Sequence, residues 1–314
     1  MKEIYISAVI PAYNEEKNIA ALYKELTRVL KNINNNYELI FIDDGSTDKT
    51  LAQLKRLRSS DKKVKIKAFT KNFRKASALA AGLKGASGKF IVTMDADLQD
   101  SPNEIPKLLR EIVQGFDMVV GWKYPRDDPL PKVISSKIFN ALVRMLTKLK
   151  IHDCDSNFRI MRREVIPYLD LYSGLYRYIP IIAYRRGFNV GEVKVKHRPR
   201  FHGKSKYGLT RLYTGFFDLI TIKFLLEYNK KPLHFFGSLG LVFLFSGIIS
   251  GLYLLYVKFI LHELIGQRPL LILTILLVSM GIQFISIGLI GEMIANASQN
   301  KKDEYVISEK HGFD

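Results

Sequence analysis

The sequence predicts an α/β fold with a mostly parallel sheet, followed by an interfacial helix and a two-helix transmembrane hairpin. Up to Gly121, short β-branched or aromatic runs alternate with segments of helical periodicity. This alternation is typical of right-handed crossovers between parallel strands. Beyond Pro232, two long runs, 233–257 and 270–291, contain no Asp, Glu, Lys or Arg. Runs of this length and composition are expected to span a bilayer.

The alternation places the elements in order. Strands are expected at 5–10, 39–42, 64–69, 90–94 and 118–121. Helices are expected from residue 14 or 15 onward, and at 49–57, 76–84 and 102–114. Because the carboxyl ends of parallel strands share one edge of a sheet, a ligand site is expected at that edge.

Composition limits the partners. The 314 residues carry a formal net charge of +18, which indicates a polyanionic partner: nucleic acid, an anionic membrane surface or a phosphorylated ligand. The single cysteine, Cys154, excludes an intrachain disulfide and a Cys-rich zinc site. No cleavable signal peptide is expected, since the apolar run 4–11 is too short. The predicted transmembrane hairpin, and the acidic residues that follow the predicted strands, argue against binding of nucleic acid.

A cluster of oxygen ligands follows the strand expected at 90–94. Asp95 and Asp97 lie two residues apart, with Gln99 and Asp100 just beyond. Two carboxylates at this spacing can bind one hard divalent cation and leave positions open for water and a diphosphate. The pattern therefore favours a metal–diphosphate site, with a solvated acidic turn as the alternative.

Polar residues also follow the first two strands, at Tyr13-Asn14-Glu15 and Asp43-Asp44. Such side chains accept hydrogen bonds from ribose hydroxyls and base NH groups. A dinucleotide-binding fold is the competing interpretation, but no Gly-x-Gly-x-x-Gly follows the first strand. The crevice is thus expected to bind a nucleotide through a metal.

Four motifs in order, AVIPAYNEE (8–16), FIDDGSTD (41–48), KNF (71–73) and MDADLQD (94–100), resemble those of family 2 glycosyltransferases of the GT-A fold. The resemblance covers about residues 4–210 and is strongest to dolichyl-phosphate mannose synthases and GtrB-like polyprenyl-phosphate glucosyltransferases. It implies an inverting transfer of a single sugar from a nucleotide-sugar of the UDP-glucose or GDP-mannose type to polyprenyl or dolichyl phosphate. One departure is Arg74, where many relatives carry Gly.

The resemblance also implies site residues. Mg²⁺ or Mn²⁺ is expected on Asp95, Asp97 and Gln99. Donor contacts are expected from Pro11, Tyr13, Glu15, Asp43, Asp44, Asp95, Ala96 and Asp97.

A candidate base is less clear from the sequence. GtrB-like relatives commonly carry Asp immediately before Phe-Arg, and this chain has Asn157 there. Asp155 or Asp153 is the alternative, and Asp155 is predicted to be catalytic together with Asp97. A lipid monophosphate, with a second pKa of about 6, is largely a dianion at neutral pH and needs no base.

Cations that resemble those of lipid-phosphate enzymes are expected to bind the acceptor phosphate. Trp122 is the only tryptophan, so the Gln-x-x-Arg-Trp signature of processive synthases is absent. The alternative interpretation is that the cations are ordinary surface charges. The cations concerned are Lys123, Arg126, Lys132, Arg200 and Lys206, and the hydroxyls of Ser136 and Ser205 are expected to bind the same phosphate.

The expected domains are a GT-A catalytic domain at 1–206, an interfacial amphipathic helix and linker at 207–231, two transmembrane helices within 232–296, and a polar tail at 297–314. A core-facing helix is the alternative for 207–231. Flanking lysines predict a cytosolic catalytic domain and cytosolic termini. Glycines in both apolar runs predict helix association, including a homo-oligomer formed through the transmembrane helices.

Two other functions stay open at this point. One is sugar transfer to another lipid, such as diacylglycerol or a ceramide. The other is a glycosyltransferase-like membrane scaffold without turnover, against which the Asp95, Asp97 and Gln99 set argues.

Overall fold

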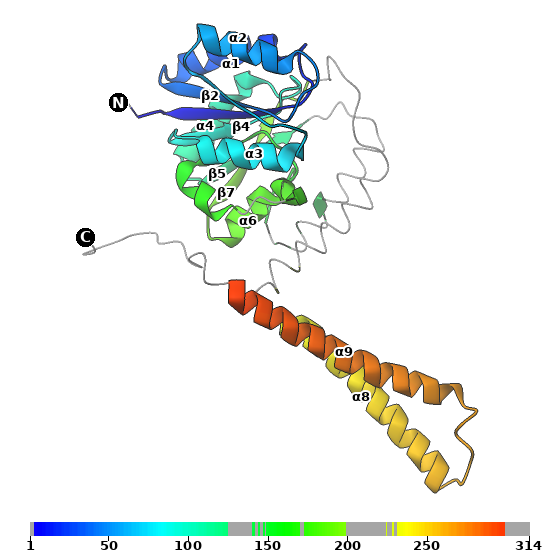
Figure 1. Ribbon diagram of the computed structural model, residues 1–314. Helices are drawn as coiled ribbons and strands as arrows, with labels where there is room; N and C mark the ends of the chain where they lie inside the picture. Colours follow the sequence, from blue (N-terminus) through cyan, green and yellow to red (C-terminus); the bar gives the residue numbers. More distant parts are fainter. Residues whose placement is uncertain are drawn as a thin grey trace. The chain divides into compact units, whose positions relative to one another are not determined.

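The computed structural model describes residues 3–124, 149–169, 173–198 and 231–298, together with a few isolated positions between these ranges. The chain divides into two compact units, Met1–Ile222 and Lys223–Asp314 (Figure 1). The expected strands and crossover helices lie in the first unit, and the two apolar helices lie in the second.

A mixed sheet forms the centre of the first unit. Its order is β3-β2-β1-β4-β6-β5-β7. The strands are β1 Ile6–Ala12, β2 Tyr37–Asp43, β3 Val64–Ala68, β4 Phe90–Thr93, β5 Met118–Lys123, β6 Arg159–Arg162 and β7 Val190–Val195. Only β6 runs antiparallel to its neighbours within the described sheet, between β4 and β5. The prediction of a mostly parallel α/β fold is confirmed, but β6 and β7 were not predicted.

Helices flank this sheet (Figure 1). They are α1 Ile19–Ile33, α2 Thr50–Ser60, α3 Arg74–Gly85, α4 Ile105–Val113 and α6 Ile179–Arg185, with 3-10 turns η1 Pro102–Glu104, η2 Arg163–Tyr168 and η3 Ser173–Tyr178. The first helix begins at Ile19, four or five residues later than expected, because residues 14–16 bond to the loop after β2 instead.

The first strand extends two residues beyond its expected end, through Pro11. Proline has no N–H to donate and is tolerated where one side of a strand is unpaired. The pairing of β1 with β4 ends at Val9, while its pairing with β2 continues to Ala12. Pro11 therefore sits where β1 has become an edge on the β4 side.

Glu38 is a buried carboxylate near the amino end of β2, away from the carboxyl ends of the strands. Glu38 in β2 is 1% exposed and accepts hydrogen bonds from the Ser7 hydroxyl at 2.5 Å and the Ser87 amide at 2.8 Å, and it pairs with Lys65. Burial alone would raise the pKa of Glu38, but these donors outweigh burial and hold the pKa below its usual value. The carboxylate is therefore a stabilising anion of the folded state.

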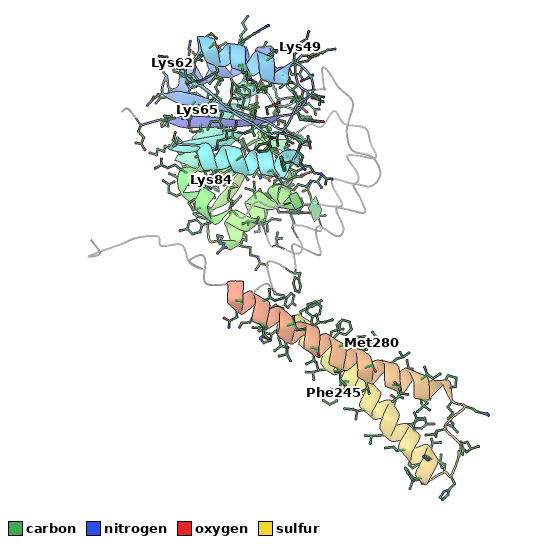
Figure 2. All side chains as sticks on the ribbon, in the orientation of Figure 1. Lys49, Lys62, Lys65, Lys84, Phe245 and Met280 are labelled. Carbon is green, nitrogen blue, oxygen red and sulfur yellow. The ribbon has the colours of Figure 1, made fainter. Side chains whose placement is uncertain are left out.

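The second unit is a hairpin of two long helices, α8 Pro232–Phe259 and α9 Pro269–Ser298. Each is long and apolar enough to cross a membrane, with only 17% and 6% of the most apolar windows buried. Phe245 and Met280 are among the outward-facing apolar side chains (Figure 2). A core helix of a soluble protein would bury such residues. The predicted spans, 233–257 and 270–291, lie inside these helices.

Glycines bring the two helices together. A Cβ at Gly240 would lie 2.8 Å from the Gly281 carbonyl oxygen, and one at Gly247 would lie 3.0 Å from the Val278 backbone nitrogen. Small residues between membrane helices allow the two helix backbones to approach this closely. These glycines contact the other helix of the same hairpin, so they do not support association between copies of the chain. The homo-oligomer stays a prediction.

Candidate functional site

The carboxyl ends of β1, β2 and β4 meet at one edge of the sheet, because β1 lies between the other two strands. The loops after β1 and β2 are bonded to each other. The Asn14 amide donates to Ser46 Oγ at 3.0 Å, and the Thr47 amide donates to Asn14 Oδ1 at 2.8 Å. The Glu15 amide donates to Thr50 Oγ1 at 2.8 Å. The predicted donor-binding segments at 13–15 and 43–44 are therefore neighbours in a shared frame.

Asp43 and Asp44 organise the backbone of this frame. Asp43 is 1% exposed and its Oδ2 accepts from the Ser46 amide at 3.4 Å. Asp44 Oδ1 accepts from the Phe73 amide at 2.7 Å, which ties the loop after β3 to the end of β2. Gly45, with a φ of +70°, lets this loop approach, since a Cβ there would lie 2.4 Å from the Lys71 carbonyl carbon.

The loop after β4 holds the predicted metal ligands. Asp97 Oδ1 accepts from the Gln99 amide at 3.2 Å, and Leu98 between them has a φ of +62°. A left-handed leucine costs about 1–2 kcal/mol, and here burial of its side chain holds it in place. Within the described residues, no three His, Cys, Asp or Glu side chains form a metal site.

Asp95 has two partners that the sequence did not reveal. Lys75 Nζ, from the first turn of α3, lies 2.6 Å from Asp95 Oδ1 and 2.8 Å from Oδ2. Asn157 Nδ2 donates to Asp95 Oδ1 at 2.9 Å. Burial alone would lower the pKa of Lys75, but Asp95 outweighs burial and raises it. Asn157, which sequence reasoning treated only as a missing base, thus helps to fix a predicted metal ligand.

Asp100, Lys123 and His197 form a buried cluster beside Gln99. Lys123 Nζ lies 2.9 Å from Asp100 Oδ1, and His197 Nδ1 lies 3.6 Å from the same oxygen. The other ring nitrogen of His197 lies 3.3 Å from Gln99 Nε2. Burial alone would raise the pKa of Asp100, but Lys123 and His197 hold it well below its usual range. Lys123, predicted to bind acceptor phosphate, is therefore already paired.

Strand β6 brings the stretch before it to this edge of the sheet. Thr93 Oγ1 donates to the Asn157 carbonyl at 2.6 Å. Asp155, the predicted base, has Oδ1 3.5 Å from Arg177 Nε. Arg159 is fully buried and donates to the Tyr176 carbonyl at 3.4 Å. A catalytic role for Asp155 stays a prediction.

The other predicted acceptor residues lie outside the described ranges, as does most of the expected interfacial helix at 207–231. Those acceptor residues are Arg126, Lys132, Ser136, Arg200, Ser205 and Lys206.

Comparison with known proteins finds relatives over most of the chain. Residues 7–169 match the model of "Glycosyl transferase family 2". The chain is 35% identical over 300 residues to a dodecaprenyl-phosphate galacturonate synthase from Rhizobium johnstonii, covering 94% of this chain and 89% of that protein. It is 31% identical over 291 residues to an undecaprenyl-phosphate 4-deoxy-4-formamido-L-arabinose transferase from Aeromonas hydrophila, covering 92% and 88%.

Solved structures agree on the fold. The crystal structure of glucosyl-3-phosphoglycerate synthase from Mycobacterium tuberculosis with Mn²⁺ and UDP-glucose superposes with a TM-score of 0.53 at 20% identity, covering 70% of this chain and 78% of that one. At this identity the similarity concerns the fold alone. Together with the family match over half of the chain and the alignment to relatives over nearly its whole length, it leads to one conclusion: the chain belongs to glycosyl transferase family 2.

Proposed function

We propose that this protein transfers a single sugar, with inversion, from a nucleotide-sugar to a polyprenyl phosphate at a membrane surface. The observation that carries the proposal is the alignment with polyprenyl-phosphate sugar enzymes over 94% and 92% of the chain, which includes both apolar helices. A similarity limited to the α/β unit would support sugar transfer without indicating the acceptor.

The nucleotide is proposed to bind where the loops after β1 and β2 meet. Their backbone is fixed by the bonds of Asn14 and Asp44, so the loops require little ordering when the donor binds. Contacts to the donor are assigned to Pro11, Tyr13, Glu15, Asp43, Asp44, Asp95, Ala96 and Asp97. The identity of the sugar and of the nucleobase stays open, because a UDP-linked and a GDP-linked donor can both hydrogen-bond to the polar residues at this edge of the sheet.

Asp95, Asp97 and Gln99 are proposed to hold Mg²⁺ or Mn²⁺. Their donor set fits a hard divalent cation: two carboxylates and an amide on one turn, with Asp95 29% exposed in its side chain. These three ligands leave coordination positions that oxygens of the donor diphosphate and water can fill. A bound cation would neutralise the charge that develops on the departing nucleotide diphosphate.

The acceptor phosphate is proposed to act as the nucleophile without a general base. One phosphate oxygen forms a bond to the anomeric carbon of the sugar while the bond from that carbon to the diphosphate oxygen breaks, which inverts the anomeric centre. The side chain of Asn157 is a neutral amide and does not serve as a general base. A phosphate dianion needs no general base. The contribution of the protein is alignment of the two substrates.

The two helices are proposed to span the bilayer with the catalytic unit and both termini in the cytosol. The support is the distribution of cations, which flank the hairpin ends more densely than its connecting loop. Those at the ends are Lys223, Lys230, Lys231, Lys301 and Lys302, whereas the loop side has Lys258 and Arg268.

A transfer assay tests this function. Detergent-purified protein is incubated with polyprenyl phosphate, Mn²⁺ or Mg²⁺, and a panel of labelled UDP- and GDP-sugars that includes glucose, mannose, galacturonate and 4-deoxy-4-formamido-L-arabinose. Metal-dependent label in the lipid with one donor is the expected result. Asp97→Asn should abolish it, whereas Glu164→Gln, an exposed acidic residue of η2, should not.

Two outcomes would contradict the proposal. Label transferred only to diacylglycerol or a ceramide would reassign the acceptor. Nucleotide binding without transfer to any lipid would favour a non-catalytic scaffold.

A further inference from the structure

We propose that Lys75 is a built-in competitor of the divalent cation at Asp95. In this inference the Lys75 ammonium occupies the carboxylate in the empty enzyme, and the metal displaces it only when the nucleotide diphosphate arrives. The inference rests on the proposed metal role of Asp95 and adds an order of binding to it.

The contact between Lys75 and Asp95 is direct. The ammonium nitrogen lies 2.6 Å and 2.8 Å from the two carboxylate oxygens, so it covers both atoms that would bind a metal. A second partner of Asp95, the Asn157 amide, is neutral and bonds to one oxygen at 2.9 Å. A divalent cation bound to the same carboxylate would lie close to the ammonium and compete with it, because like charges at that separation repel.

The position of Lys75 in α3 is unfavourable without an anion. It is the second residue of the helix, after Arg74, and the first turn contains no acidic residue. The N-terminal end of a helix carries partial positive charge, so two cations there reduce helix stability. Asp95 compensates for this charge in the empty enzyme, and a displaced Lys75 needs another anion nearby.

The backbone before Lys75 is fixed at some cost. Arg74 has a φ of +71°, a left-handed conformation that is unfavourable for a residue with a Cβ. The preceding residue, Phe73, donates its amide to Asp44 Oδ1 at 2.7 Å. Lys75 is therefore held toward Asp95 by the same loop that contacts the predicted nucleotide-binding edge.

These features predict ordered binding. A metal that arrives alone must break the ion pair and leave Lys75 without an anion. A metal that arrives with a nucleotide diphosphate brings the replacement anion, to which Lys75 can then bind. By linkage, the nucleotide strengthens metal binding and the metal strengthens nucleotide binding by the same factor.

The test measures Mn²⁺ binding to the purified full-length protein by electron paramagnetic resonance, without nucleotide and with saturating UDP or GDP. Lys75→Met is expected to bind Mn²⁺ about tenfold more tightly without nucleotide, a change typical of removing one charged competitor. Its affinity should gain less than that of the wild type when nucleotide is added. Lys75→Arg keeps the charge and should resemble the wild type.

Lys71→Met is the matched control, because Lys71 lies in the same loop but stacks over the Phe73 ring at 5.3 Å. Its metal affinity should equal that of the wild type. Lys75→Met binding Mn²⁺ no more tightly than the wild type, with nucleotide coupling intact, would overturn the inference alone. No difference between the wild type and Asp95→Asn, even with nucleotide, would overturn the metal role and this inference together.

Discussion

Replacing Asp100 by Asn is expected to destabilise the catalytic unit by about 3 kcal/mol. The carboxylate is 1% exposed, and the Lys123 side chain that pairs with it is 15% exposed. Breaking a buried pair by removing one partner costs about 3–5 kcal/mol, since a buried charge is left without compensation. The remaining exposure of Lys123 places the cost at the lower end of that range.

The apparent melting temperature gives the measurement. For a unit of this size, each kcal/mol corresponds to about 2–4 °C, so Asp100→Asn should lower the midpoint by about 6–12 °C. Trp122, the only tryptophan of the chain, precedes Lys123 in β5 and stacks on His152 at 4.1 Å. Its fluorescence therefore reports on unfolding next to the pair, in a different unit from the two apolar helices.

A second variant makes the reasoning refutable. Lys123→Met combined with Asp100→Asn removes both charges and should recover at least half of the lost stability, because replacing a buried pair by apolar groups is often close to neutral. A single variant that melts within about 2 °C of the wild type would show that the pair is well solvated. A double variant with additive losses would show that the charges do not interact.

Three further predictions concern other parts of the molecule. The lowered pKa of Glu38 means that its carboxylate stabilises the fold above its unfolded pKa of about 4.3. This stabilisation is lost as pH falls through the pKa of the folded state. The Glu38→Gln variant should therefore melt at a lower temperature than the wild type at pH 7, and its melting temperature should change less than that of the wild type between pH 5 and 2. Gly240→Ala should weaken the helical hairpin, measured as a lower SDS fraction at which dyes on its two helices separate, whereas Gly251→Ala should not, because its new Cβ meets only an ordinary contact at 3.6 Å. Asn157→Asp should change the transfer rate by less than about threefold if no base is needed. A rise of more than about tenfold in the transfer rate at pH 7 would instead show that the lack of a base limits the wild type. The new carboxylate beside Asp95 should also tighten Mn²⁺ binding.

The strand-end motifs were predictable because they depend on local signals. Strands β1, β2 and β4 are short apolar runs followed directly by polar residues, and parallel pairing then brings their ends together. Strand β6 escaped prediction because Arg159–Arg162 is four residues long and its two central residues are both apolar. Neither an alternating pattern nor a continuous apolar run marks so short a segment.

The partners of the acidic residues were less predictable than the acids themselves. Lys75 and Asp95 are 20 positions apart, and Gln99 and His197 are 98 apart. Such contacts depend on how helices and antiparallel strands register against the sheet, which composition and periodicity do not specify. The sequence indicated that cations would be needed near the acidic crevice, but not which cation would face which acid.

These ion pairs divide the lysines near the acidic residues between two roles, pairing with carboxylates of the same chain and binding the acceptor phosphate. Lys123 is committed to Asp100, and Lys75 is committed to Asp95 in the empty enzyme, so neither attracts a lipid phosphate at full strength before the donor binds. A phosphate that must approach an anionic diphosphate needs cations without such internal partners. The proposed contribution of Lys123 to acceptor affinity should therefore be small while its pair with Asp100 is intact, measured as the change in KM for the lipid.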